Sequence, residues 1–317
     1  MKTIGIDFGG TSVKLGVLRA DAMGVPEVVD VAPAIPTAEY DGPEPMLVRI
    51  RESVELLRDR HAGVCAIGVG VPGFVDWERG LVYGLTNVPG WRLFPLRDRL
   101  AKMTRLPVCL DNDANAMAYA EWRFGAGAGC RSMVGVTLGT GVGGGLILDG
   151  SIFRGFNSLA GEIGQMSIDF RGKDGPYGNF GALERYVGHH RVTARAQARY
   201  AEAGRPRSQS DCTPDRVAAA AATGDPVAIK LWQDVARELA TALAAIVWLL
   251  NPEKVVVGGG MSRAGDVLFE PLRRSLESQL DGPFLEGFEL AAARFGPEAG
   301  VVGTALLAAD AVGAGAA

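Results

Sequence analysis

The sequence is poor in cysteine, has no excess of positive charge and contains no long hydrophobic run. No two cysteines have CxxC spacing, which argues against a disulfide framework or a cysteine zinc site; they are Cys65, Cys109, Cys130 and Cys212. A net charge of −4 without Lys/Arg clusters gives no sign of nucleic-acid binding. The longest apolar run, residues 239–250, is too short to cross a bilayer, and Asp7 interrupts any secretion signal. We therefore expect a cytoplasmic protein that binds neither nucleic acid nor membrane.

What is present indicates an ordinary globular protein with an unusual distribution of glycine. The 317 residues, 48% of them hydrophobic and 21% charged, are enough for two domains of ordinary size. The chain has 44 glycines, and many of them gather in short turns between apolar segments.

One polar cluster follows an apolar segment near the middle of the chain. Residues 108–110 are typical of a buried strand, and the Ala-rich residues 114–121 are typical of a helix. Asp111, Asn112 and Asp113 lie between them, where open α/β sheets bind their ligands. The alternative is that these side chains only cap the helix, and for Asp111 we expect capping rather than a contact with a metal.

A strand–glycine turn–strand pattern occurs twice. Residues 134–141 align position by position with residues 4–11, and each segment is followed by a second apolar strand. The repeat predicts an α/β fold of duplicated domains, 1–118 and 119–317, forming two lobes around a central cleft. The last helix, about 300–317, is expected to pack back on the first lobe. Chance similarity of two apolar hairpins is the alternative.

The glycine turns have the composition of phosphate-binding loops. Adjacent glycines let backbone N–H groups approach an anion, and threonine hydroxyls add donors. The two copies offer Gly9, Gly10, Thr11, Thr137, Gly139, Thr140 and Gly141. A third turn, Gly258, Gly259 and Gly260, follows an apolar strand and precedes a predicted helix, which suits a nucleotide. Asp7 beside the first loop could hold Mg²⁺.

These features together predict phosphoryl transfer to a small polar acceptor. Such a reaction needs positioned phosphates, Mg²⁺ and a base that accepts the proton of the attacking hydroxyl. Asp113 is our candidate for the base. Sugar hydroxyls need donors and acceptors, which Asn112, Glu162 and Glu184 would supply.

Six motifs, in this order, make the sequence similar to the ROK family of sugar kinases, within the actin-like (ribonuclease H-like) ATPase superfamily. They are Asp7-Phe-Gly-Gly-Thr11, Gly68-Val-Gly-Val-Pro-Gly73, Asn112-Asp-Ala-Asn115, Leu138-Gly-Thr-Gly-Val-Gly-Gly-Gly145, Gly161-Glu-Ile-Gly164 and Asn251-Pro-Glu-Lys-Val-Val-Val-Gly-Gly-Gly260. The resemblance implies that Asp113 is the base, and that Asn87, Asn112, Glu162, Gln165 and Glu184 bind the sugar. It implies ATP on the three glycine turns, with Lys14 and with Asp7 holding Mg²⁺ through water.

The sequence departs from the family where most members hold a structural zinc ion. The family's zinc ligands are one His and three Cys, and here those positions carry Gln165, Gly175, Tyr177 and Ala182. Because all four ligands are replaced together, we expect no structural zinc. We expect Tyr177 and Phe180 to pack the loop instead. Gln165 leaves the sugar preference open, since the family's His also contacts the sugar.

The expected activity is therefore ATP-dependent phosphorylation of a hexose, glucose at O6 being the first choice. Alternatives are N-acetylmannosamine, N-acetylglucosamine, fructose or mannose as acceptor, and polyphosphate as donor. A sugar-sensing repressor is less expected, because the first glycine loop begins near residue 4 and leaves no room for a preceding helix-turn-helix. The resemblance also implies a homodimer.

Overall fold

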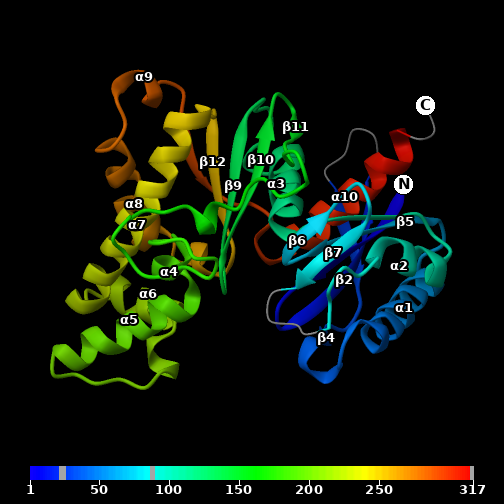
Figure 1. Ribbon diagram of the computed structural model, residues 1–317, viewed down its shortest axis with the longest axis horizontal. Coiled ribbons are helices and arrows are strands. Elements are labelled where there is room, and N and C mark those ends of the chain that lie inside the picture. The colour runs from blue at the N-terminus through cyan, green and yellow to red at the C-terminus, as the bar shows by residue number, and fades with distance from the viewer. Residues whose placement is uncertain (21–25, 86–89, 315–317) are drawn as a thin grey trace. The chain divides into compact units, whose positions relative to one another are not determined.

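The computed structural model describes residues 1–20, 26–85 and 90–314, which fall into two compact units (Figure 1). The first unit comprises Met1–Arg131, Gly145–Gly161 and Arg294–Ala317, and the second comprises Ser132–Gly144 and Glu162–Ala293. The chain therefore visits the first unit three times. The domain division expected after residue 118 follows the internal repeat and stays a prediction.

The first unit is built on a mixed sheet with the strand order β3-β2-β1-β5-β8, with β4 paired to β2. Its strands are β1 (Lys2–Phe8), β2 (Ser12–Arg19), β3 (Glu27–Val31), β4 (Ile35–Pro36), β5 (Val64–Val71) and β8 (Val108–Asn112). β1 and β2 form an antiparallel hairpin around the first glycine turn, whereas β1, β5 and β8 run parallel. A separate hairpin joins β6 (Gly73–Asp76) to β7 (Leu81–Leu85).

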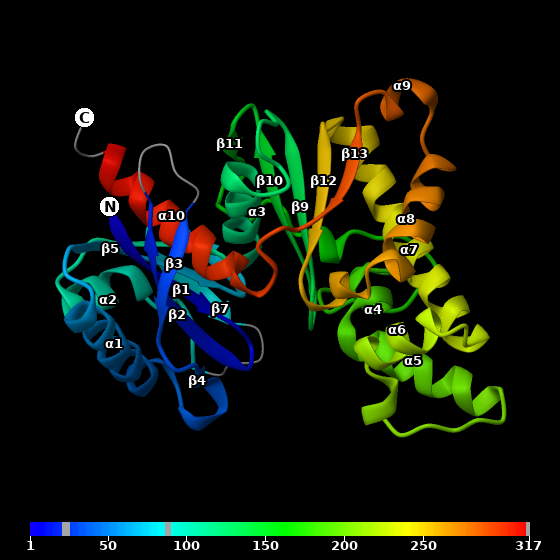
Figure 2. The same cartoon turned by 180° about the vertical axis from the view of Figure 1, so that it is seen from behind.

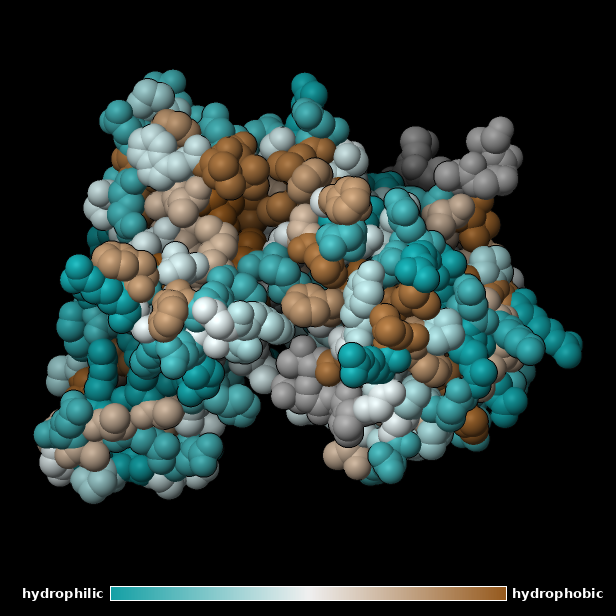
Figure 3. All heavy atoms as spheres, in the orientation of Figure 1, coloured by the Kyte–Doolittle hydropathy of each residue, from teal (hydrophilic) through white to brown (hydrophobic). Residues whose placement is uncertain are grey.

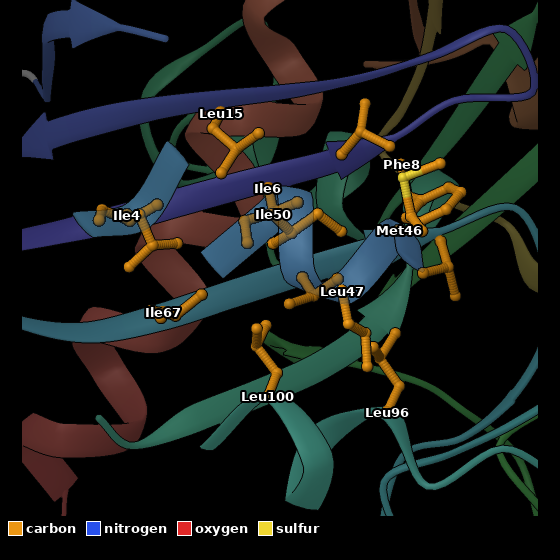
Figure 4. Packing of buried hydrophobic residues seen from close by; sticks show 14 of the residues in the cluster. Ile4, Ile6, Phe8, Leu15, Met46, Leu47, Ile50, Ile67, Leu96 and Leu100 are labelled. Carbon is orange, nitrogen blue, oxygen red and sulfur yellow. The ribbon is translucent and has the colours of Figure 1, made fainter. Parts of the chain in front are cut away.

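Helices α1 (Pro43–Arg60) and α2 (Leu96–Thr104) cover one face of this sheet (Figure 1). The buried positions of α1 recur at helical spacing, as in Leu47, Ile50, Val54 and Leu57, so one stripe of the helix faces the strands. Figure 4 shows apolar side chains from both helices meeting those of β1, β2 and β5. The residues labelled there are Ile4, Ile6, Phe8, Leu15, Met46, Leu47, Ile50, Ile67, Leu96 and Leu100.

The other face of the sheet is covered by α10 (Ala299–Ala314), as Figure 2 shows from behind. α3 (Asp113–Phe124) packs mainly against α10. α10 approaches β5 and α3 so closely that the contact positions require glycine. A β carbon built on Gly68 would lie 1.8 Å from the backbone oxygen of Thr304, and one built on Gly303 would lie 1.8 Å from that of Ala116. The closing helix is thereby held directly against β5 and α3.

The second sheet repeats the topology of the first. Its order is β11-β10-β9-β12-β13, which matches β3-β2-β1-β5-β8 strand by strand. In both sheets the opening strand (β1 or β9) lies in the middle, with the next two strands of the chain on one side and two later strands on the other. Its strands are β9 (Met133–Leu138), β10 (Val142–Leu148), β11 (Ser151–Ile152), β12 (Lys254–Gly258) and β13 (Glu289–Ala292). β12 runs parallel to both β9 and β13. The duplicated α/β architecture predicted from the repeat is confirmed.

Helices of the second unit lie beside this sheet and below it in Figure 1. They are α4 (Glu184–Val187), α5 (His189–Glu202), α6 (Pro214–Ala222), α7 (Pro226–Leu250), α8 (Asp266–Glu277) and α9 (Gly282–Leu285). The short 3₁₀ segments of the chain are η1 (Thr37–Glu39), η2 (Ile163–Gln165), η3 (Ser210–Cys212), η4 (Gly260–Ala264) and η5 (Gly296–Glu298). α7 begins and ends as its sequence indicates: the Asp225 side chain accepts a hydrogen bond from Val227 N at 3.0 Å, and Asn251 ends the helix in the left-handed conformation.

The surface in the orientation of Figure 3 is largely hydrophilic, with hydrophobic residues gathered where β9 and β12 lie. Among the described residues, no helix is both long and apolar enough to cross a lipid bilayer.

Candidate active site

The polar cluster expected at a strand end lies at the junction of β8 and α3. β8 ends at Asn112, and Asp113 is the first residue of α3. The Asp113 carboxylate accepts a hydrogen bond from the next backbone N–H, Ala114 N, at 2.9 Å. Its position at the carboxyl end of β8, a strand that runs parallel to β5 at the edge of the sheet, is the one predicted for the proton acceptor.

The helix cap is provided by Asn112, and not by Asp111 as expected. Asn112 Oδ1 accepts hydrogen bonds from Ala114 N at 2.8 Å and Asn115 N at 3.3 Å, and its Nδ2 donates to Gly73 O at 3.0 Å. The side chain thus fixes the orientation of the junction. Its role as a sugar ligand stays a prediction.

Asp111 is instead the centre of a buried ion-pair network. Its side chain is 2% exposed and accepts hydrogen bonds from Arg154 Nε at 3.0 Å and Nη2 at 2.7 Å. Asn115 Nδ2 and Asn112 N also donate to it, at 2.9 and 2.8 Å. The Arg154 guanidinium stacks on the ring of Trp77, 4.3 Å from its centroid. The prediction that Asp111 caps the helix is wrong because the side chain pairs with a cation 43 residues away.

The first glycine loop connects β1 to β2 and is closed by a hydrogen bond from Gly9 N to Ser12 O at 2.9 Å. A β carbon on Gly10 would meet no described atom within 4 Å, so the backbone of the loop is open. Thr11 is exposed at its tip. An open, glycine-rich loop of this kind fits an anion such as a phosphate group.

Asp7 lies beside this loop, paired across the hairpin with Lys14. Burial raises the pKa of the Asp7 carboxyl, and the charge of Lys14 acts in the opposite direction. The first turn of α10 lies against the carboxylate, since a β carbon on Gly300 would be 2.5–2.8 Å from its atoms. A partly buried carboxylate without full charge compensation fits Mg²⁺, which binds one or two carboxylates together with phosphate oxygens.

The second glycine loop connects β9 to β10 and is joined to one of the predicted sugar ligands. Gly139 N donates to Gly141 O at 2.9 Å, and Val142 N donates to the Glu184 carboxylate at 3.0 Å. A β carbon on Gly141 would lie 2.3 Å from Glu184 Oε2, so a larger residue there would displace the Glu184 carboxylate. The Thr137 hydroxyl accepts a hydrogen bond from Gly143 N at 3.1 Å, while Thr140 is exposed on the loop.

The negative charge of Glu184 affects the ionisation of Glu162. Glu162 precedes η2 and is partly buried. Burial, followed by the negative charge of Glu184, raises the pKa of Glu162. The second unit therefore brings together the two carboxylates predicted to bind the sugar.

Residues 165–184, where the sequence lacks the four zinc ligands of the family, form a loop that is held by hydrogen bonds. Leu183 N donates to Met166 O at 2.9 Å, Gly175 N to Asn179 O at 2.6 Å, and Asn179 Nδ2 to Gln165 O at 2.9 Å. Across the described part of the chain, no three His, Cys, Asp or Glu side chains are grouped so that they could hold a metal ion. The expected absence of zinc remains a prediction.

Tyr177 and Phe180 do not pack this loop as expected. Their side chains are 64% and 54% exposed. The loop is short and its backbone pairs with itself, as in the bridges between Ser167 and Ala182 and between Asp174 and Phe180. Both aromatic residues therefore lie largely in solvent and do not fill the loop.

The third glycine turn borders a cavity of about 330 Å³, which lies at the lower end of the size range of small-molecule sites. Gly259 adopts φ +85, and a β carbon on Gly260 would meet no described atom within 4 Å. The walls come from η4, α6 and neighbouring helices: Pro214, Asp215, Ala218, Ala219, Ala222, Trp232, Gly260, Met261, Arg263, Ala264 and Val267. The indole N–H of Trp232 is buried and has no hydrogen-bond partner among the described residues.

The predicted residues thus form local groups within each unit. The first unit holds Asn112 and Asp113 at one junction and Asp7, Gly9, Gly10, Thr11 and Lys14 at the first hairpin. In the second unit, Glu184 is hydrogen-bonded to the loop of Thr137, Gly139, Thr140 and Gly141, and Glu162 and Gln165 lie at η2. Gly258 is the last residue of β12, and Gly259 and Gly260 follow it. Asn87 lies outside the described residues.

Arg154 and Trp232 were not identified from the sequence. Arg154 pairs with Asp111 and Trp232 lines the cavity, and in both cases the neighbouring residues are distant in the chain. Their residue types gave no local signal. Arg154 precedes the glycine-flanked turn at Glu162 by eight residues, but nothing in that spacing indicates Asp111 as its partner.

Comparison with known proteins gives matches over nearly the whole chain. The glucokinase of Halalkalibacterium halodurans is 36% identical over 311 residues, covering 95% of this chain and 92% of that protein. The glucokinase of Thermotoga maritima is 33% identical, covering 99% of both. The crystal structure of a ROK family glucokinase from Streptomyces griseus in complex with glucose and AMPPNP has a TM-score of 0.84 at 32% identity, covering 98% of this chain and all of that one.

The family model that matches is described as the ROK family, and it spans residues 3–311. The resemblance seen in the six motifs is confirmed by this match and by the relatives above. The chain belongs to the ROK family.

Proposed function

We propose that the protein phosphorylates glucose at O6, with ATP as donor and Asp113 as general base. The position of Asp113 carries the proposal: it opens α3 at the end of β8, fixed by the cap that Asn112 provides. The likeness to glucokinases over the full chain supports glucose and ATP as the substrates.

In the proposed reaction the Asp113 carboxylate takes the proton of the sugar's O6 hydroxyl while O6 forms its bond to the γ-phosphorus of ATP. The bond from that phosphorus to the β–γ bridging oxygen breaks, and ADP leaves with the electron pair. A carboxylate in this role accelerates such a step by roughly 10²–10⁴-fold. Asp113 has no chemistry to perform on the phosphate itself.

The two glycine loops would bind the phosphates through backbone N–H groups, at Gly9, Gly10 and Thr11 and at Gly139, Thr140 and Gly141. Lys14 would add positive charge near the first loop. Asp7 would hold Mg²⁺ through water, and the ion when bound would neutralise charge on the phosphate oxygens. The turn at residues 258–260 and the adjoining cavity would hold the adenosine end.

Glu162, Glu184 and Gln165 would bind the sugar hydroxyls, and Asn112 and Asn87 would add amide groups. Carboxylates accept hydrogen bonds from hydroxyls, and two of them on one sugar fix its orientation. The connection from Glu184 to Val142 N ties this part of the site to the second glycine loop.

The test is the formation of glucose 6-phosphate and ADP by the purified protein with ATP and Mg²⁺. The same assay on mannose, fructose, N-acetylglucosamine and N-acetylmannosamine, and with polyphosphate in place of ATP, ranks the alternative substrates. We expect glucose and ATP to give the highest kcat/KM. Sugar binding without turnover of any acceptor would refute the proposal in favour of a sugar-sensing regulator. The homodimer implied by the family stays a prediction, which sedimentation tests.

A further inference from the structure

The loop between the two sugar-binding carboxylates folds back on its own ends. Its ends are joined by the hydrogen bond from Leu183 N to Met166 O, which brings Glu184 and the η2 segment after Glu162 together. Its tip, residues 175–179, is closed by Gly175 N and Asn179 O, and Asn179 Nδ2 donates to Gln165 O in the same η2 segment. The tip is therefore tied to the η2 segment, which begins directly after Glu162.

Tyr177 stands at this tip, followed by Gly178 with φ +79, which turns the chain. Its ring is 64% exposed, so it does not serve as a packing residue of the loop. Partial burial, followed by the negative charges of Glu162 and then Glu184, raises the pKa of the Tyr177 hydroxyl. Both carboxylates thus lie within electrostatic range of the phenol, and the phenol keeps its proton at neutral pH.

A sugar site formed by two carboxylates also needs a hydrogen-bond donor. Ionised carboxylates only accept hydrogen bonds, whereas each sugar hydroxyl has one proton to donate and lone pairs that need donors. A protonated phenol supplies a donor beside the two acceptors. It also has a flat apolar ring that can lie against a sugar face.

We propose that Tyr177 is a specificity-determining residue of the sugar site, whose phenol O–H hydrogen-bonds a hydroxyl of the sugar held by Glu162 and Glu184. The inference rests on the proposed function, because it assigns a further contact to the same sugar site.

The experiment pairs a protein variant with substrate analogues. Tyr177→Phe removes the hydroxyl and keeps the ring, and kcat/KM is measured for wild type and variant on glucose and on its 1-, 2-, 3- and 4-deoxy analogues. On glucose the variant is expected to lose about 3- to 10-fold, through KM rather than kcat, as for one neutral hydrogen bond. On the analogue that lacks the contacted hydroxyl, wild type and variant should be equal.

Tyr186→Phe is the matched control. Tyr186 belongs to the same region, but its hydroxyl accepts a hydrogen bond from Lys173 N at 3.2 Å and so has a structural role. Any effect of Tyr186→Phe should be the same for all analogues. If Tyr177→Phe behaves in this uniform way, or has no effect on glucose, the assignment of Tyr177 is wrong.

The wild-type rates separate this inference from the proposed function. If wild type phosphorylates glucose and Tyr177→Phe shows no analogue-specific loss, the inference fails and the function stands. If wild type prefers another sugar of the panel, the same comparison is made with deoxy analogues of that sugar. If no sugar is phosphorylated, the function fails and the inference fails with it.

Discussion

Replacing Arg154 by methionine should destabilise the protein strongly, because it leaves a carboxylate buried without its counter-ion. Asp111 is 2% exposed and accepts four hydrogen bonds, two of them from the Arg154 guanidinium. Methionine keeps the apolar stem of the side chain but leaves Asp111 with two donors and no positive charge. Breaking a buried pair in this way costs about 3–5 kcal/mol of unfolding free energy.

The cost is measured by urea denaturation followed by tryptophan fluorescence. Hydrogen exchange of the α3 amides shows whether the loss is local to the junction that carries Asp113. Arg49→Met is the matched control, since the ion pair between Arg49 and Glu52 is exposed, and we expect it to cost less than about 1 kcal/mol.

The double variant Arg154→Met with Asp111→Asn refines the test, because it removes the buried charge together with its partner. Asparagine can still accept from Asn115 Nδ2 and Asn112 N. The double variant should therefore be more stable than Arg154→Met alone, with a coupling energy at the upper end of the usual range of about 0.5–3 kcal/mol. An Arg154→Met variant as stable as Arg49→Met would refute the reasoning.

Three further predictions follow from the packing, the titration and the loop. Gly68→Ala on β5 should lower the melting temperature, because its β carbon would lie 1.8 Å from Thr304 O on α10 and overpacking costs about 1–3 kcal/mol. Gly313→Ala, also on α10 but in open space, should not lower it, and equal melting temperatures for the two variants would contradict the packing of α10 on β5. Because the pKa of Glu162 is raised, its charged form is lost at a higher pH than for an ordinary glutamate, so glucose affinity measured by calorimetry should fall as pH drops through that raised pKa, and Glu162→Gln should remove this dependence. Metal analysis of the purified protein should give no stoichiometric zinc, and one zinc per chain would overturn the prediction for the 165–184 loop.

Local signals in the sequence predicted the elements that position the site. The change from apolar residues to Asp111, Asn112 and Asp113 predicted the junction of β8 and α3, and Asp225 and Asn251 marked both ends of α7. In each case the determining contact lies within four residues along the chain. Such contacts depend on side-chain type and spacing, which the sequence displays directly.

The repeat of the glycine turns predicted more than local structure, since it led to the matching strand orders of the two sheets. The pairing of Asp111 with Arg154 and the seating of α10 on Gly68 were not predictable in the same way. Both contacts join residues far apart in the chain. The local sequence around an aspartate before a helix is the same whether its side chain caps the helix or forms an ion pair. The expectation that Tyr177 and Phe180 pack the loop was wrong because sequence alone does not show which side chains of an irregular loop face solvent.

The central claim is that Asp113 accepts the proton of the sugar hydroxyl, and the rate of glucose 6-phosphate formation by Asp113→Asn tests it most directly. Asparagine keeps the shape of the side chain but cannot take the proton. We predict a fall in kcat of roughly 10²–10⁴-fold, with glucose affinity by calorimetry close to that of wild type. A variant that keeps wild-type turnover would contradict the account.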